Sequence, residues 1–290
     1  MTKLMDFPSR KRAGHILTLL TCYDACFAAI LQDSDIDAVL VGDSAAMVMH
    51  GHTSTLTATV EMIAAHVRAV RAGAPTLPII ADMPFLSTRG SLETAVTAAG
   101  ALMAAGADGV KIEGLIGHEQ LIPHLIHSGI PVMGHLGLTP QMVHVLGGYK
   151  VQGKTDDAAA IILEQARELE ALGCFGIVAE CVPTALGTRM ASQLEIPVIG
   201  IGAGDHTDGQ ILVLQDMLGL GSGRVPKFVR KFMDGKQLVA AAVNDYIASS
   251  RAGSFPGPDE QYGGYTGSST AEAEAEAGVP YSSSPGARNG

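Results

Sequence analysis

The sequence contains no tryptophan, and its aromatic residues make up only 4% of the chain. Proteins that bind single-stranded nucleic acids stack the bases on aromatic side chains, so no such platform is expected. Basic residues are also scarce, with 19 Lys and Arg against 29 Asp and Glu and a net charge of −10. A chain without a basic stripe does not neutralise phosphates, which excludes nucleic acids and anionic membranes as expected partners.

Long apolar runs and paired cysteines are missing as well. The longest apolar stretch near the N-terminus, Ile16 to Leu20, is too short for a signal peptide or a membrane span. No two of the four cysteines have C-x-x-C spacing: Cys22, Cys26, Cys174 and Cys181. We therefore expect a soluble, cytoplasmic protein whose cysteines are small apolar residues in a reducing compartment.

From about Ile16 to Leu220, short β-branched runs alternate with helical patterns. Strands are predicted over Ile16–Thr21, Ala38–Val41, Pro78–Ala81, Gly109–Ile112, Ile130–Gly134, Gly176–Ala179 and Pro197–Ile201. Helices are predicted over Val60–Arg71, Ser91–Ala105, Asp156–Leu172 and Phe228–Ser249. This alternation indicates a parallel sheet, and seven or eight units over roughly 200 to 250 residues fit a (β/α)₈ TIM barrel.

An open, doubly wound sheet is the competing fold. Its usual G-x-G-x-x-G turn after the first strand is absent, because that strand runs into Thr21-Cys22-Tyr23-Asp24. We predict one α/β barrel domain over residues 1–262. Residues 263–290 are rich in Gly, Ser, Ala and Glu, so we expect them to form a disordered C-terminal tail.

Four of the apolar runs end in an acidic residue: Asp43, Asp82, Glu113 and Glu180. In a parallel barrel the carboxyl ends of all strands meet on one face, where barrel enzymes keep their chemistry. Carboxylates are collected at one place to hold a cation, to move protons, or both. The sequence therefore predicts that the four side chains share one site.

Two interpretations remain open for the first three carboxylates. Asp43, Asp82 and Glu113 could hold a hard cation such as Mg²⁺, or they could be solvated strand ends and helix N-caps. Lys111 precedes Glu113 by two residues, so both side chains point to one side of the strand. Lys111 is either an anchor for a substrate carboxylate or a lysine in solvent.

The fourth carboxylate is separated in sequence from the others. Glu180 lies among apolar neighbours, which would raise its pKa and suit a general base; pairing with a cation such as Arg189 is the alternative. His135 ends the fifth predicted strand and is expected to face the same site, where we assign it to the substrate.

Two glycine-rich segments suggest phosphate binding. Residues 148–155, GYKVQGKT, match the P-loop pattern, with Lys154 and Thr155 in the phosphate and Mg²⁺ positions. No buried strand is predicted directly before them, and bulky Tyr149 would occupy the tight turn, so a nucleotide site is the weaker interpretation. Residues 200–204, GIGAG, are either a phosphate cradle or a plain turn.

Several motifs, in order over about residues 13 to 262, resemble the ketopantoate hydroxymethyltransferase family. They are residues 41–44 (VGDS), 51–56 (GHTSTL), 81–85 (ADMPF), 110–114 (VKIEG), 134–141 (GHLGLTPQ), 147–153 (GGYKVQG), 200–204 (GIGAG) and 208–210 (DGQ). The P-loop lookalike falls inside one of these family motifs. The tail has no expected counterpart in the family.

The resemblance implies a (β/α)₈ barrel of the phosphoenolpyruvate mutase and isocitrate lyase type, assembled as a homo-oligomer, often a decamer. It implies that Mg²⁺ is held by Asp43, Asp82 and Glu113. The substrate, the α-keto acid 3-methyl-2-oxobutanoate, would contact Asp43, Ser44, Asp82 and Lys111. Glu180 would accept the proton, and 5,10-methylenetetrahydrofolate would donate the one-carbon unit to give 2-dehydropantoate in pantothenate biosynthesis.

Other functions compete with this one. The first competing function is that of an α-keto acid C–C lyase with the same type of barrel. Such lyases typically contain a Lys-Lys-Cys-Gly-His segment, which is absent from this chain. A P-loop nucleotide-binding protein and a catalytically silent metabolite-binding barrel are the others. A silent barrel is disfavoured because the chain contains the full set of charged site residues: Asp43, Asp82, Lys111, Glu113 and Glu180.

Overall fold

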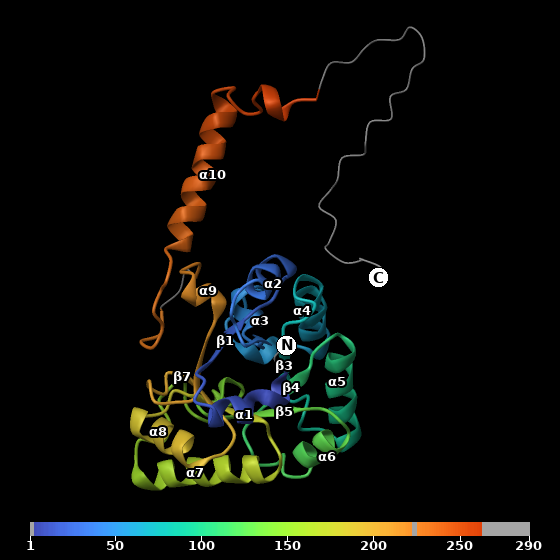
Figure 1. Cartoon of the computed structure of the whole chain (residues 1–290), viewed down its shortest axis with the longest axis vertical. Helices are drawn as coiled ribbons and strands as arrows, with labels where there is room; N and C mark the ends of the chain where they lie inside the picture. Colours follow the sequence, from blue (N-terminus) through green and yellow to red (C-terminus); the bar gives the residue numbers. More distant parts are fainter. Residues whose placement is uncertain (1–2, 222–224, 263–290) are drawn as a thin grey trace.

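The computed structural model, which describes residues 3–221 and 225–262, contains a closed barrel of eight parallel strands (Figure 1). Each strand pairs with the next along the chain, and the last pairs with the first. The strands are β1 (Leu17–Thr21), β2 (Ala38–Val41), β3 (Ile79–Asp82), β4 (Gly109–Glu113), β5 (Val132–Gly137), β6 (Gly176–Glu180), β7 (Val198–Ile201) and β8 (Gly209–Leu212). The predicted (β/α)₈ barrel is confirmed.

Helices follow most strands and surround the barrel, except that α1 precedes β1 and α10 projects away from the barrel (Figure 1). They are α1 (Phe7–Arg12), α2 (Ala25–Gln32), α3 (Ala45–Val48), α4 (Val60–Gly73), α5 (Leu92–Ala104), α6 (Leu121–His127), α7 (Asp156–Ala171), α8 (Thr184–Gln193), α9 (Leu214–Met217) and α10 (Gly235–Arg251). The predicted tail, residues 263–290, lies outside the described residues.

The structure departs from the prediction at one strand that the sequence does not predict and at two predicted elements. The unpredicted strand is β8, whose four residues begin with Gly209 and Gln210 and include only two apolar residues. Strand β5 begins two residues later than predicted and continues to Gly137, which places His135 inside the strand. The last helix begins at Gly235 rather than Phe228, because the backbone N–H groups of Phe232 and Gly235 donate to the carbonyls of Met217 and Leu218 instead of closing a helical turn.

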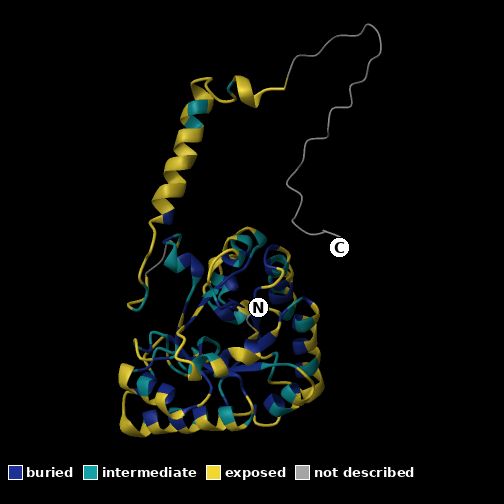
Figure 2. Cartoon of the chain, viewed as in Figure 1, coloured by how far each residue is buried: buried dark blue, intermediate teal, exposed yellow. Residues whose placement is uncertain are grey.

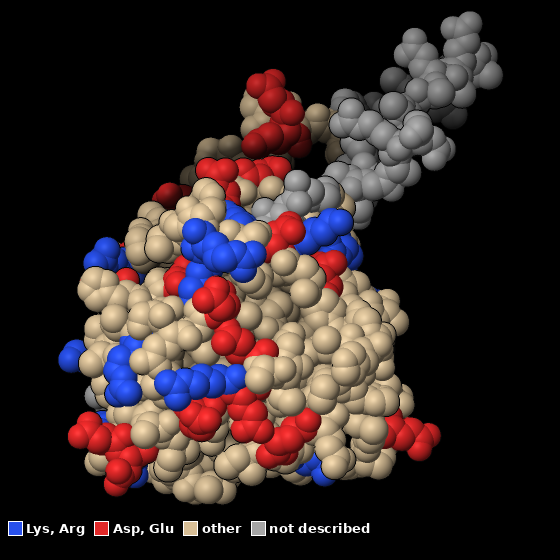
Figure 3. Space-filling model, turned by 60° about the horizontal axis from the view of Figure 1, so that its bottom comes forward, with Lys and Arg blue, Asp and Glu red and all other residues tan. Residues whose placement is uncertain are grey.

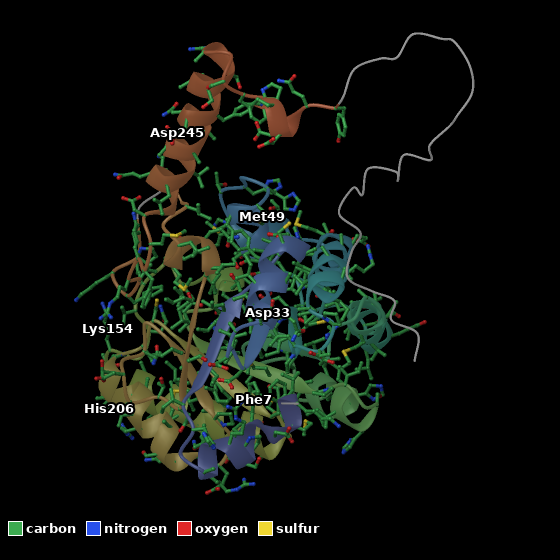
Figure 4. All side chains as sticks on the ribbon, turned by 45° about the horizontal axis from the view of Figure 1, so that its top comes forward. Phe7, Asp33, Met49, Lys154, His206 and Asp245 are labelled. Atoms are coloured by element: carbon green, nitrogen blue, oxygen red, sulfur yellow. The ribbon has the colours of Figure 1, made fainter. Side chains whose placement is uncertain are left out.

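The barrel interior is divided into an apolar part and a charged part. Alternate strand residues point inward, and near the amino ends of the strands these form one buried cluster with residues from the N-terminal segment: Leu4, Phe7, Leu17, Leu19, Ala38, Leu40, Ile80, Met133, Phe175, Val178, Ile199 and Ile211. Figure 4 labels Phe7 near α1 at one end of the barrel. The next inward positions toward the carboxyl ends of β3 to β6 carry charged side chains. The apolar cluster therefore forms the floor of the barrel interior beneath these charged side chains.

The surface has two notable features. Helix α10 buries only Gly235, and its apolar side chains, including Leu238, Val243 and Tyr246, are exposed (Figure 2). On the face shown in Figure 3, acidic and basic side chains are interspersed. Within the described part of the chain, no helix is both long enough and apolar enough to cross a membrane.

Two helical glycines provide a matched test of packing between the barrel helices. A Cβ on Gly73, at the end of α4, would lie 2.1 Å from the carbonyl oxygen of Ala25 in α2, whereas a Cβ on Gly100 in α5 meets nothing within 4 Å. We expect Gly73→Ala to lower the free energy of unfolding by about 1–3 kcal/mol through overpacking. Gly100→Ala should raise it by up to about 1 kcal/mol. Urea titration of both variants measures the difference, and equal effects would contradict the close α2–α4 contact.

Candidate functional site

The predicted site residues lie together at the carboxyl ends of the strands. Asp82, Glu113 and Glu180 are the last residues of β3, β4 and β6, and Asp43 follows β2 by two residues. A cavity of about 690 Å³ opens at this end of the barrel. All the predicted site residues line it: Asp43, Ser44, Asp82, Lys111, Glu113, His135 and Glu180.

Strand register places the charged residues of β3, β4 and β5 side by side. Asp82 is paired with Lys111, and Glu113 is paired with His135. Lys111 Nζ lies 2.9 Å from Asp82 Oδ1 and 3.7 Å from Glu113 Oε1, and the three side chains are only 3–4% exposed. Burial lowers the pKa of Lys111, but the carboxylates of Asp82 and Glu113 raise it more, so the ammonium stays charged.

Asp43 is the carboxylate whose charge is least compensated. Its backbone N–H donates to Asp82 Oδ2 at 2.9 Å, which holds the two residues together. Burial, followed by the charges of Asp82 and Glu113, raises the pKa of Asp43 well above its usual range. Burial also raises the pKa of Asp82, although Lys111 opposes this effect. The site therefore favours an added cation.

The alternative that these carboxylates cap helices is wrong. The helices that follow β2, β3 and β4 have Ser44, Ser91 and Gln120 as their N-cap residues. Asp82 and Glu113 instead contact Lys111, and Lys111 is buried rather than solvated.

Sequence reasoning missed two polar residues that contact predicted site residues. Gln141 donates its backbone N–H to Glu113 Oε2 at 3.0 Å and its side-chain amide to Asp43 Oδ2 at 2.9 Å. The Tyr23 hydroxyl lies 2.8 Å from Ser44 Oγ. Gln141 lies in the 3₁₀ turn Pro140–Met142 and Tyr23 in the segment after β1, neither of which has a periodic pattern, so only their places beside Pro140 and after β1 could have suggested them.

Glu180 faces His135 rather than the predicted alternative, Arg189. His135 Nε2 lies 3.3 Å from Glu180 Oε2, and Lys111 Nζ lies 3.0 Å from His135 Nδ1. Burial and the charge of Lys111 lower the pKa of His135. Glu113 and Glu180 raise it by more than this, so the pKa is raised to about 9. Lysine only donates, so its bond to Nδ1 requires the neutral ring with its hydrogen on Nε2. His135 Nε2 is close to Glu180 but makes no hydrogen bond in the described part of the chain.

The donor set fits a hard cation that keeps part of its shell for water or substrate. Within residues 3–221 and 225–262, no three His, Cys, Asp or Glu side chains are arranged to hold a metal ion by themselves. Mg²⁺ in enzymes is commonly bound by one or two carboxylates plus waters and substrate oxygens. Asp43 and Asp82, linked by the Asp43 N–H, provide such oxygen donors beside the cavity.

The P-loop interpretation is wrong. The segment follows the 3₁₀ turn Pro140–Met142 rather than a strand, and Thr155 accepts the Ala158 N–H as the N-cap of α7. Figure 4 shows Lys154 at the edge of the molecule. The other glycine-rich segment packs against side chains: a Cβ on Gly202 would lie 2.8 Å from the Phe228 ring.

Solved structures with the same fold act on small acids. A phosphonopyruvate hydrolase in complex with oxalate and Mg²⁺ matches with a TM-score of 0.58 at 11% identity, over 90% of this chain and 93% of that one. A 2,3-dimethylmalate lyase, described as a member of the PEP mutase/isocitrate lyase superfamily, matches with a TM-score of 0.55 at 15% identity, over 91% of this chain and 93% of that one. These likenesses support the barrel fold.

Sequence relatives are much closer. A 3-methyl-2-oxobutanoate hydroxymethyltransferase of Bdellovibrio bacteriovorus is 48% identical, over 90% of this chain and 100% of the relative. The enzyme of the same description from Coxiella burnetii is 47% identical, over 87% of this chain and 95% of the relative. The family model described as ketopantoate hydroxymethyltransferase matches residues 1–258. The chain therefore belongs to the ketopantoate hydroxymethyltransferase family.

Proposed function

We propose that the protein transfers a one-carbon unit from 5,10-methylenetetrahydrofolate to C3 of 3-methyl-2-oxobutanoate, with Mg²⁺ as the cofactor. The product is 2-dehydropantoate, which enters pantothenate biosynthesis. The observation that carries the proposal is the arrangement of charged groups in the cavity. The buried ammonium of Lys111 lies among carboxylates, and another carboxylate, Glu180, lies beside His135. Family membership supports this assignment.

In the proposed reaction, Glu180 removes the C3 proton of the keto acid. The resulting carbanion equivalent attacks the methylene carbon of the folate, so that a new C–C bond forms and one of the two carbon–nitrogen bonds of that carbon breaks. Water displaces the second nitrogen and supplies the hydroxyl oxygen. The proton taken by Glu180 and one proton from the water go to the two folate nitrogens, and tetrahydrofolate leaves. His135 Nε2 lies 3.3 Å from Glu180 Oε2 and places its ring beside the base.

Lys111 and the acidic residues position the substrate in this proposal. The Lys111 ammonium offsets the charge of the substrate carboxylate, and Ser44, fixed by Tyr23, offers a hydroxyl beside it. Asp43 and Asp82, with Glu113 behind them, would hold Mg²⁺. The ion would polarise the keto oxygen and so make the C3 proton more acidic. The phosphonopyruvate hydrolase of the same fold holds both oxalate and Mg²⁺.

The test is formation of 2-dehydropantoate by the purified protein. We expect product from 3-methyl-2-oxobutanoate and 5,10-methylenetetrahydrofolate with Mg²⁺, and none after chelation of the metal. A C–C lyase would instead cleave a 2-hydroxy acid to a 2-oxo acid and a second carboxylic acid, without folate. Lyase activity in the absence of transferase activity would refute the proposal.

Removing one carboxylate tests the proposed metal site. We expect Asp43→Asn to weaken Mg²⁺ binding by at least about tenfold, since changes even to groups behind a ligand commonly cost that much. Isothermal titration with Mg²⁺ measures the affinity independently of catalysis. Asp35→Asn, an exposed aspartate before β2, is the matched control. Equal Mg²⁺ affinity in the wild type and both variants would exclude Asp43 as a ligand.

Three further assignments stay predictions: a substrate contact for His135, a homo-oligomer such as a decamer, and a cytoplasmic location.

A further inference from the structure

The cavity is much larger than the keto acid requires. Pockets for drug-sized ligands begin at about 300 Å³, whereas this cavity has about 690 Å³. A five-carbon acid is smaller than a drug-sized ligand, so it leaves more than half of the cavity free. The remaining volume is large enough for a second ligand.

The two sides of the cavity differ in chemistry. The segments at the ends of β2 to β6 carry the cluster of Asp43, Asp82, Lys111, Glu113, His135 and Glu180. The side formed by β7, β8 and the segments after them is lined by apolar residues: Ile201, Ile211, Leu212, Val213, Pro226, Phe228 and Val229. The keto acid belongs to the charged side, and an apolar or aromatic ligand fits the other.

The apolar side carries one carboxylate and an aromatic ring. Asp216, on α9, lines the cavity and is half-buried, and burial raises its pKa. The Phe228 ring is held against Gly202, where a Cβ would lie 2.8 Å from the ring. A carboxylate and an aromatic ring that line the same part of a cavity suit a flat heterocycle with paired N–H donors.

Lysines lie at the edge of the same cavity. Lys150 and Lys227 both line it and are exposed, and neither forms an ion pair with another described residue. The chain as a whole has a net charge of −10, so two lysines at the mouth provide a local attraction for an anionic group.

We propose that this side of the cavity binds the folate co-substrate, an inference that rests on the proposed function. The Asp216 carboxylate accepts the N3–H and 2-amino hydrogens of the pterin ring, a donor pair that matches two carboxylate oxygens as a guanidinium does. Phe228 packs against the ring system, and Lys227, with Lys150, pairs with the glutamate carboxylates. The reactive methylene carbon then points toward the charged side.

Steady-state kinetics of Asp216→Asn test the pterin contact. We expect KM for 5,10-methylenetetrahydrofolate to rise tenfold or more, with a much smaller change in KM for the keto acid. Asp245→Asn, an exposed aspartate on α10 (Figure 4), is the matched control. A 2-desamino analogue of tetrahydrofolate, used as an inhibitor, keeps N3–H but lacks the 2-amino donor, so Asp216→Asn should weaken its binding less than it weakens binding of the natural folate. An equal loss of affinity for both ligands would indicate a structural effect and overturn the assignment.

Lys227→Met tests the glutamate contact. We expect the wild type to prefer a polyglutamylated folate over the monoglutamate and the variant to lose most of that preference. Lys154→Met is the control, because Lys154 is exposed and lies outside the cavity lining. An active wild type with unchanged folate kinetics in Asp216→Asn and Lys227→Met would overturn this inference alone. An inactive wild type would overturn the proposed function instead.

Discussion

Glu180→Gln is expected to lower the rate of hydroxymethyl transfer by about 10²–10⁴-fold, the usual contribution of a positioned general base. The amide keeps the size of the side chain and its place beside His135 but cannot accept the C3 proton. Exchange of the C3 proton of 3-methyl-2-oxobutanoate in D₂O, with Mg²⁺ and tetrahydrofolate present, isolates this step from the later C–C bond formation.

The control for this variant is Glu168→Gln, an exposed glutamate on α7 that does not line the cavity. It should exchange the proton at the wild-type rate. Undiminished exchange by Glu180→Gln would show that another group removes the proton. The absence of exchange by the wild type would contradict the proposed deprotonation step.

Lys111→Met is expected to lower the free energy of unfolding by about 3–5 kcal/mol, because it leaves buried carboxylates without their cation. Lys111 Nζ is 2.9 Å from Asp82 Oδ1, and both side chains are almost fully buried. We also expect the affinity for the keto acid to fall, since the only buried ammonium in the cavity lining is lost. Urea titration without ligands measures the stability.

The double variant Lys111→Met with Asp82→Asn separates charge from packing. Removing a neighbouring negative charge should restore part of the lost stability, because fewer buried charges are then uncompensated. If the double variant is as unstable as the sum of the single ones, the lysine acts through its aliphatic stem rather than through its charge.

The barrel and its charged end were predictable because both follow from short-range patterns. Buried parallel strands appear as apolar runs, and residues that close such runs at Asp82, Glu113 and Glu180 must meet at one end of the barrel. The spacing of Lys111 and Glu113 correctly placed both on one side of β4, within 3.7 Å of each other.

Other parts were not predictable for identifiable reasons. Strand β8 is four residues long, and only its second half, Ile211 and Leu212, is apolar; pairing with β1 and β7 defines it. Gln141 comes from a 3₁₀ turn, and its contacts to Asp43 and Glu113 span 98 and 28 residues of sequence. Contacts of this range arise only once the barrel has closed.

The apolar floor of the barrel has a consequence for the fate of hydrogen isotopes. Leu17, Ile80 and Met133 lie in the packed cluster beneath the charged residues, so water reaches Glu180 from the mouth. A hydrogen taken from C3 therefore leaves the site past this mouth. A bulky ligand that narrows the mouth slows the replacement of that hydrogen by solvent deuterium without stopping it, so the exchange rate reports how far each folate analogue closes the cavity.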